Sequence, residues 1–341
     1  MLQIESGQTQ HNLYVDNVMK PTSPWPSITE PGLVAYLGDS SHATLLTHQE
    51  QNSGNAIHYL LPDSSRGTKA NRTKSDDVEN QILEQRGAFL LPPRSLADKL
   101  VESYFAWVHP MIPVINRTRF MSQYRDPDDP PSILLVQCVL LTGSHIYRAE
   151  HLENATAEVS ASAFYKRAKA LYDANYEDDR LVIIQSLILL GWYQGGSADA
   201  VESLGDWTRL AIAVAQGCGL HRCVDGSQLS AVDKSMRKRI WWTLFTRDRF
   251  TAMSFGRAPC INLKDSDVAM ISAQDFAEHN SRSDSKYSLT PAQVQYYLEC
   301  VKLCQAIGCI LSRHYSATAL LSSGARERLI PRPLSLIRQI L

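Results

Sequence analysis

The 341-residue chain lacks an excess of positive charge. It carries 34 Lys and Arg against 35 Asp and Glu, a formal net charge of −1 at pH 7. A protein that grips DNA over a broad face usually has a basic excess, because neutralising phosphates supplies much of the binding free energy. The composition therefore argues against extensive nucleic-acid contact by these residues.

Cysteine motifs are also missing. An odd number of scattered cysteines does not make a disulfide framework, and no Cys-x-x-Cys pair occurs. Cys300, Cys304 and Cys309 have roughly helical spacing, which favours small core residues on one helix face over a metal site. We expect a reduced, intracellular chain that binds no metal or cofactor itself. The seven cysteines are Cys138, Cys218, Cys223, Cys260, Cys300, Cys304 and Cys309.

Membrane and catalytic signatures are absent as well. The longest apolar run, LVIIQSLILLGWY (181–193), is too short to cross a bilayer and predicts a buried helix. No Walker or Rossmann glycine loop, Gly-x-Ser-x-Gly elbow or His-Glu-x-x-His motif occurs. For His109, His145 and His221, all near predicted helices, a structural role is favoured over catalysis. We therefore expect no catalytic site, no enzyme and no membrane association.

What the sequence does contain is a succession of helical patterns. Residues 1–92 are rich in Ser, Asn, Gln, Gly and Pro, and predict a largely disordered, linker-like lead-in. Within it, only GLVAYLGDSSHATLL (32–46) is apolar enough to dock onto a folded part. We predict an all-α fold: an irregular multi-helix domain over 93–275, then a helical continuation over 276–341. That continuation stops without a closing element, as in a truncated chain.

The helical period of about 3.6 residues and the capping residues place the individual helices. The first is predicted from Ser95 as its cap, with Asp98 in the first turn, to the residue before Pro110. The helix over 229–254 is predicted to begin with Ser230 as cap and Asp233 in its first turn. The others are predicted over 132–143, 163–173, 179–193, 202–220 and 291–321, and no stretch alternates as a strand would.

The segment KRIWWTLFTRDR (238–249) admits three interpretations: a core helix, a nucleic-acid strip or the wall of a ligand pocket. Helical spacing favours the core helix, because it places one apolar stripe inward and turns Lys238, Arg239 and Arg249 toward other sides. The stripe comprises Arg237, Trp241, Leu244, Phe245 and Asp248.

Asp248 is the unusual member of that stripe. A buried carboxylate is tolerated only when it is paired or hydrogen-bonded. We predict an internal ion pair from Asp248 to Arg257 or Arg222 that fixes the turn SFGRAP (254–259).

Five blocks then occur in a recognisable order: YFAWVHPMIPVINRTRF (104–120), AFYKRAKALYD (163–173), LILLGWYQGG (187–196), WTRLAIAVAQGCGLHR (207–222) and KRIWWTLFTRDRFTAMSFGRAP (238–259). Together they resemble the fungal-specific transcription factor domain, the middle homology region of fungal binuclear zinc-cluster factors, including the xylanolytic and cutinase activators. The residues that carry this signature are Tyr104, Phe105, His109, Pro110, Pro113, Phe120, Gly219, Leu220, His221, Arg239, Trp241, Trp242, Asp248, Arg249, Gly256, Arg257 and Pro259.

The resemblance implies an all-α regulatory domain that acts in the nucleus on RNA polymerase II genes of metabolism or secondary metabolism. In such factors, zinc and DNA are bound by an upstream six-cysteine cluster. This sequence has no cysteine before Cys138, so it does not contain that cluster.

The implied partners are other transcription-factor domains, co-regulators, a second copy of the chain or a small-molecule effector. DNA would be reached only through the missing module. Tyr104, Trp107, Trp192 and Trp242 are candidates to line an effector pocket between helices, although core packing is favoured for each. The alternatives are a stand-alone co-regulator that does not bind DNA, and an α-helical enzyme or scaffold.

Overall fold

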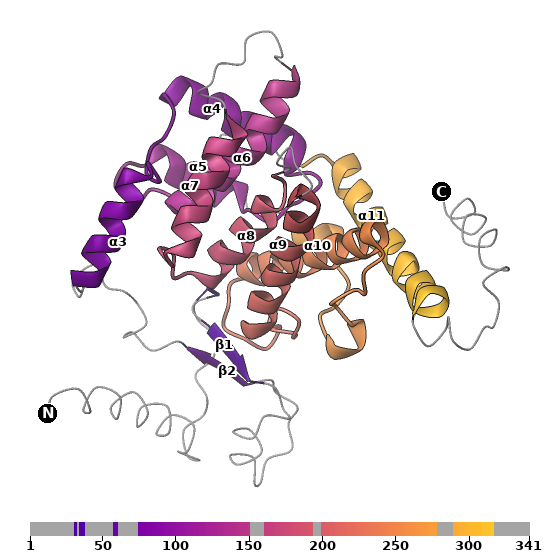
Figure 1. Cartoon of the computed structure of the whole chain (residues 1–341). Helices are drawn as coiled ribbons and strands as arrows, with labels where there is room; N and C mark the ends of the chain where they lie inside the picture. Colours follow the sequence, from indigo (N-terminus) through magenta and orange to yellow (C-terminus); the bar gives the residue numbers. More distant parts are fainter. Residues whose placement is uncertain are drawn as a thin grey trace, which may run out of the picture.

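The computed structural model describes residues 31–32, 34–37, 57–60, 74–150, 160–193, 199–277 and 289–316. Nearly all regular structure in these ranges is helical, which confirms the predicted class (Figure 1). The exception is a two-stranded antiparallel sheet of β1 (Val34–Leu37) and β2 (Ile57–Leu60), with Val34 paired to Leu60. The prediction of no strand was wrong here, because cross-strand pairing joins residues too far apart for a local pattern to show.

The helices follow one another along the chain, and the segment 256–290 separates the last two long helices. The helices are α3 (Lys74–Gln85), α4 (Arg94–Ser103), the π-helical turn η2 (Tyr104–Val108), α5 (Arg117–Arg125), α6 (Ile133–Glu150), α7 (Ala161–Asp173), α8 (Arg180–Leu190), α9 (Asp199–Gly217), α10 (Ala231–Phe255) and α11 (Pro291–Ile310), which continues into η7 (Leu311–Tyr315). Two 3-10 turns, η4 (Leu263–Asp265) and η5 (Ala273–Phe276), lie between α10 and α11. The sequence patterns did not predict α3 or α5. The end of the predicted 291–321 helix lies outside the described residues.

Local capping explains where several helices begin. The side chain of Ser230 accepts a hydrogen bond from the backbone N–H of Asp233 at 3.1 Å, which confirms the predicted start of α10. Thr290 and Gln293 form a capping box at the start of α11. The predicted start of α4 was wrong by two residues: Pro93, not Ser95, is the cap, and Ser95 lies inside the first turn. Asp98 instead forms an ion pair with Arg94 at 2.9 Å.

The predicted single helix from 95 to 109 changes its winding at Tyr104. The N–H of His109 donates to the carbonyl of Tyr104 at 3.0 Å, the i to i+5 bond of a π-helix. The wider turn brings Tyr104, Phe105 and Val108 all into the core. Trp107 is left 56% exposed, so neither core packing nor an enclosed pocket describes it.

The core is built around α6, α8 and α10. Every residue of α8 from Ile184 to Leu190 is buried, as predicted for the apolar run. Helix α6 packs against α4, α7 and α8, while α10 packs against α9 and α11. Figure 1 shows α3 to α7 on one side and α11 on the other, with α8 to α10 between them. Across the described ranges, no helix is both long and apolar enough to cross a bilayer.

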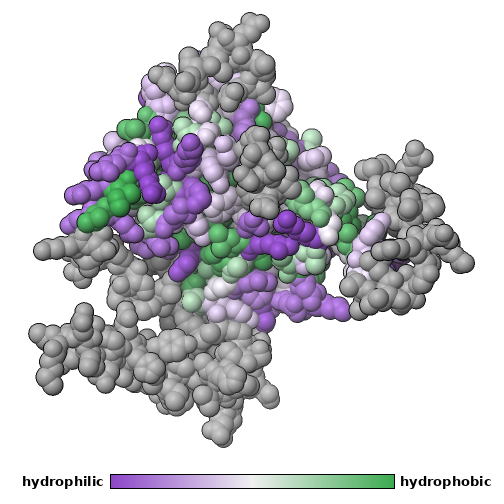
Figure 2. Space-filling view, viewed as in Figure 1, coloured by the Kyte–Doolittle hydropathy of each residue, from purple (hydrophilic) through white to green (hydrophobic). Residues whose placement is uncertain are grey.

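The surface is mixed in polarity. On the face drawn in Figure 2, hydrophilic residues surround small hydrophobic areas. Helix α3 contributes little to the core, since Leu83 is buried but Val78 and Ile82 are exposed.

The cysteine prediction holds only in part. Cys304 is buried and Cys300 is half-buried, whereas Cys309 is exposed rather than part of the core. All seven thiols are free, as expected.

Candidate functional site

Helix α10 carries the KRIWWTLFTRDR segment (238–249) and is buried on nearly all sides from Met236 to Ala252. Its apolar residues pack as a core helix, as predicted. Arg239 and Arg249 do not turn away from the core, however, and both are buried along with Arg237. The spacing argument failed because α10 is enclosed by α9, α11 and the 261–276 segment rather than lying on one face. These three guanidinium groups are not available to DNA phosphates.

Asp248 lies inside the protein, with 4% of its surface exposed. Its Oδ2 accepts from Arg249 Nη1 at 2.7 Å and from the backbone N–H of Ile261 at 2.9 Å. Its Oδ1 accepts from the backbone N–H of Cys260 at 2.9 Å. The predicted buried ion pair therefore exists, and it holds the chain that follows the SFGRAP turn.

The predicted partners of Asp248 were wrong. Arg222 pairs with Asp267 at 3.2 Å, and the guanidinium of Arg257 lies over the ring of Phe255. Neighbouring residues on a helix point about 100° apart, so helical spacing does not predict an ion pair between Asp248 and Arg249. The pair forms because the long Arg249 side chain also donates to the carbonyl of Ile261 at 2.6 Å, which turns it back toward Asp248.

The turn itself depends on Gly256. It adopts φ 62°, the left-handed conformation that glycine accepts without steric cost, and ends α10. Gly256 and Pro259 are exposed and Arg257 is half-buried, so the signature residues of this turn lie at the surface.

The 104–120 block meets α10 in the core. The Phe105 ring contacts the rings of His109 and Phe120 at centroid distances of 5.3 and 5.7 Å. Arg239 of α10 donates to the carbonyl of Ile115 at 3.3 Å. Burial, with the positive charges of Arg239 and Arg117 nearby, holds the pKa of His109 well below its ordinary value. His109 is therefore a neutral core residue: its ring lies 6.0 Å from that of Tyr104, and Pro110 and Pro113 are buried as well.

The 219–221 block joins the end of α9 to α10 and to the lead-in. Gly219 has φ 66°, and Leu220 donates to the carbonyl of Ala215 at 2.9 Å, which closes α9. The ring of His221 lies 5.9 Å from Trp241 and 4.9 Å from Tyr36 of β1. Trp242 Nε1 donates to the carbonyl of Ala269 at 3.0 Å.

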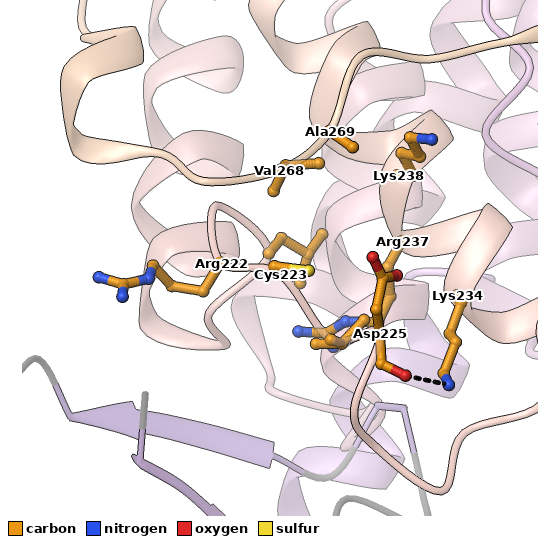
Figure 3. Close-up of a pocket in the computed structure, with 10 residues that line it drawn as sticks. Arg222, Cys223, Asp225, Lys234, Arg237, Lys238, Val268 and Ala269 are labelled. Carbon is orange, nitrogen blue, oxygen red and sulfur yellow. Dashed lines mark hydrogen bonds between the residues drawn. The ribbon is translucent and has the colours of Figure 1, made fainter. Parts of the chain in front are cut away.

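A shallow surface pocket opens beside these residues, with a volume of about 340 Å³ including the part open to solvent. Figure 3 shows the charged side chains that line it, from the 220–225 loop and the first turns of α10. They are Arg222, Asp225, Lys234, Arg237 and Lys238. Sequence reasoning missed this pocket because three separate segments form it, the third being 268–269. The aromatic candidates Tyr104, Trp107, Trp192 and Trp242 do not line it.

The fold and the buried signature define an all-helical domain built on an arginine-rich core helix. In the part of the chain that the structure describes, no three His, Cys, Asp or Glu side chains gather as metal ligands would. Residues 101–325 match the fungal specific transcription factor domain. The chain belongs to this family, which confirms the resemblance seen in the sequence.

Individual relatives agree with that assignment. The chain is 53% identical over 319 residues to cutinase transcription factor 1 alpha of Fusarium vanettenii, covering 93% of this chain and 35% of the relative. It is 34% identical over 256 residues to the acetamidase regulatory protein of Aspergillus oryzae, covering 74% and 32%. The chain thus spans about a third of the length of these curated relatives. No solved structure matches it.

Proposed function

We propose that this chain is the regulatory part of a nuclear transcription regulator that controls RNA polymerase II transcription of metabolic or secondary-metabolite genes. The observation that carries the proposal is the family match over 101–325, with a signature that occupies the core of the fold. Two of its relatives are named as a cutinase transcription factor and an acetamidase regulatory protein.

We further propose that DNA contact and zinc binding belong to a separate six-cysteine module. The net charge of −1 and the burial of Arg237, Arg239 and Arg249 support this division. A strip that binds phosphates must expose its cations to solvent, and α10 does the reverse. The same observations also fit the alternative of a co-regulator that acts through protein partners and never contacts DNA.

A tethering assay tests the regulatory proposal. The chain is fused to an unrelated DNA-binding domain and placed upstream of a reporter gene in a fungal host. We expect reporter output to differ from that of the tether alone. Asp248→Ala, which disrupts the core, should abolish the difference, whereas Lys166→Ala on the exposed surface of α7 should preserve it. A well-folded chain that leaves reporter output unchanged would overturn the proposal.

A band-shift assay with the chain alone tests whether DNA contact belongs to a separate module. We expect no sequence-selective DNA binding at physiological salt, because Arg237, Arg239 and Arg249 of α10 are internal. Tight, sequence-selective binding would contradict the separate-module proposal. To separate a factor domain from a co-regulator, the transcript upstream of Met1 is sequenced: a six-cysteine segment supports the first, and a stop codon in frame supports the second.

A further inference from the structure

Arg237 is a buried cation with unusual partners. Its side chain is 2% exposed, and it donates to two backbone carbonyls, those of Pro31 at 3.1 Å and Cys218 at 2.9 Å. Its Nε has no hydrogen-bond partner, and no carboxylate pairs with it in the described part of the chain. Burial lowers the pKa of Arg237 to about 10, so the group stays positive at neutral pH. A buried charge is normally balanced by an opposite one.

The pocket beside Arg237 has a positive balance. Arg222 and Lys238 are each matched by a carboxylate, from Asp267 at 3.2 Å and from Asp275 at 3.0 Å. The ammonium of Lys234 instead donates to the backbone carbonyl of Asp225 at 2.8 Å, the dashed line in Figure 3. Four lining cations thus face three carboxylates, those of Asp225, Asp267 and Asp275, which leaves one positive charge.

We propose that this pocket binds one small oxyanion, a carboxylate or phosphate group, with Arg237 and Lys234 as its cations. The planar guanidinium offers several parallel N–H donors, an arrangement suited to oxyanions, and here the Nε atom has no partner. The carboxylate of Asp225 lines the same pocket and opposes an anion, so it limits the affinity. The inference rests on the proposed regulatory function, for which it supplies the chemical class of an effector.

Two arginines that line the pocket, Arg237 and Arg222, also hold the lead-in against the helical core. Arg237 donates to Pro31, and Arg222 Nη1 donates to the hydroxyl of Tyr36 at 3.2 Å. Between them, the carbonyl of Gly32 accepts from the N–H of Arg180 at 2.9 Å, and Val34 is buried. An anion that fixes the Arg237 side chain would therefore strengthen the docking of residues 31–32 and 34–36. Anion binding in the pocket would in this way stabilise the docked position of the segment that precedes the domain.

Binding is tested on the full chain by titrating sodium phosphate and sodium acetate against sodium chloride at constant ionic strength, with the melting temperature and calorimetric heat as readouts. We expect saturable binding at one site, and the two salts show which oxyanion is preferred. Lys234→Met should weaken binding about tenfold and Asp225→Asn should strengthen it several-fold, because each changes one charge at the pocket. Lys166→Met, a matched loss of an exposed charge on α7, should have no effect.

The result that would overturn the site is a response equal for all three salts, or one that the Lys234 and Asp225 variants leave unchanged while circular dichroism shows them folded. Coupling is read by hydrogen exchange at the backbone amides of β1. At an anion concentration that half-saturates the wild type, we expect phosphate or acetate to slow exchange in the wild type and to slow it much less in Lys234→Met. Binding without any change in β1 exchange would refute the coupling. The tethering assay does not depend on added anion, so failure of this inference is distinguishable from failure of the proposed function.

Discussion

Replacing Asp248 is the sharpest test of how the core is held together. Its carboxylate accepts two backbone N–H groups at 2.9 Å and the Arg249 guanidinium at 2.7 Å. Asp248→Ala removes all three bonds and leaves the Arg249 charge buried without its acid. Breaking a buried pair in this way costs about 3–5 kcal/mol of the free energy of unfolding. Urea unfolding, followed by far-ultraviolet circular dichroism and by tryptophan fluorescence, measures that loss.

Arg257→Ala is the matched control, since the sequence predicted this residue as the partner. In the structure its guanidinium lies over the Phe255 ring and beside Gly205 of α9, and it forms no ion pair in the described part of the chain, so its loss should cost less than about 1 kcal/mol. The double variant Asp248→Ala with Arg249→Met should lose less than the sum of the single variants, by about 1 kcal/mol or more, because no unpaired charge remains. If Asp248→Ala costs under about 1 kcal/mol, or Arg257→Ala costs as much, the ion-pair reasoning is refuted.

Three further predictions follow from close packing and from titration. A Cβ at Gly143 would lie 2.1 Å from the carbonyl oxygen of Leu100, so Gly143→Ala should destabilise the chain by more than about 2 kcal/mol. Gly217→Ala, where nothing lies within 4 Å, should be neutral or stabilising in the same thermal melt. Burial lowers the pKa of His109 in the folded state. Below about pH 6.5, His109 therefore binds a proton in the unfolded state but stays neutral in the folded state. The free energy of unfolding should therefore fall as the pH drops through that range, and His109→Phe should flatten the slope. A hydrogen bond from Cys304 lowers the pKa of Cys300, while Cys304 itself is buried. In mass spectrometry after iodoacetamide treatment, Cys300 should be labelled at neutral pH and Cys304 should not, and Cys304→Ala should move Cys300 labelling to higher pH. Equal labelling of both thiols would contradict the arrangement.

Helix α10 shows how well nearby residues alone predict where a helix begins and ends. Its predicted range, 229–254, differs from the observed Ala231–Phe255 by only one or two residues at each end. The start follows from the Ser230 hydroxyl and the end from Gly256, and both signals act within a few residues. The π-helical turn at Tyr104 had no comparable signal. Its extra residue per turn is stabilised by burying Tyr104 and Phe105 together, which depends on helices far along the chain.

The site divides in the same way. That Asp248 is buried and paired could be inferred from an acid on an apolar stripe, because the cost of burying a charge is a general property. The identity of its partner could not, since it depends on how residues 260–261 return to α10. The pocket and its unmatched charge were also beyond prediction. Arg237 is 206 residues from Pro31 in the sequence, and Arg239 is 124 residues from Ile115.

By itself, then, the sequence determined the helical class, most helix positions and the family signature, because periodicity, capping and turn chemistry act over one or two turns of chain. Only the tertiary structure decided which arginines of α10 lie inside, which acid meets which base, and that the lead-in docks beside a basic pocket. Those outcomes depend on whether a distant carbonyl or carboxylate arrives to balance a buried cation. A local sequence pattern does not specify which distant group will lie beside the cation.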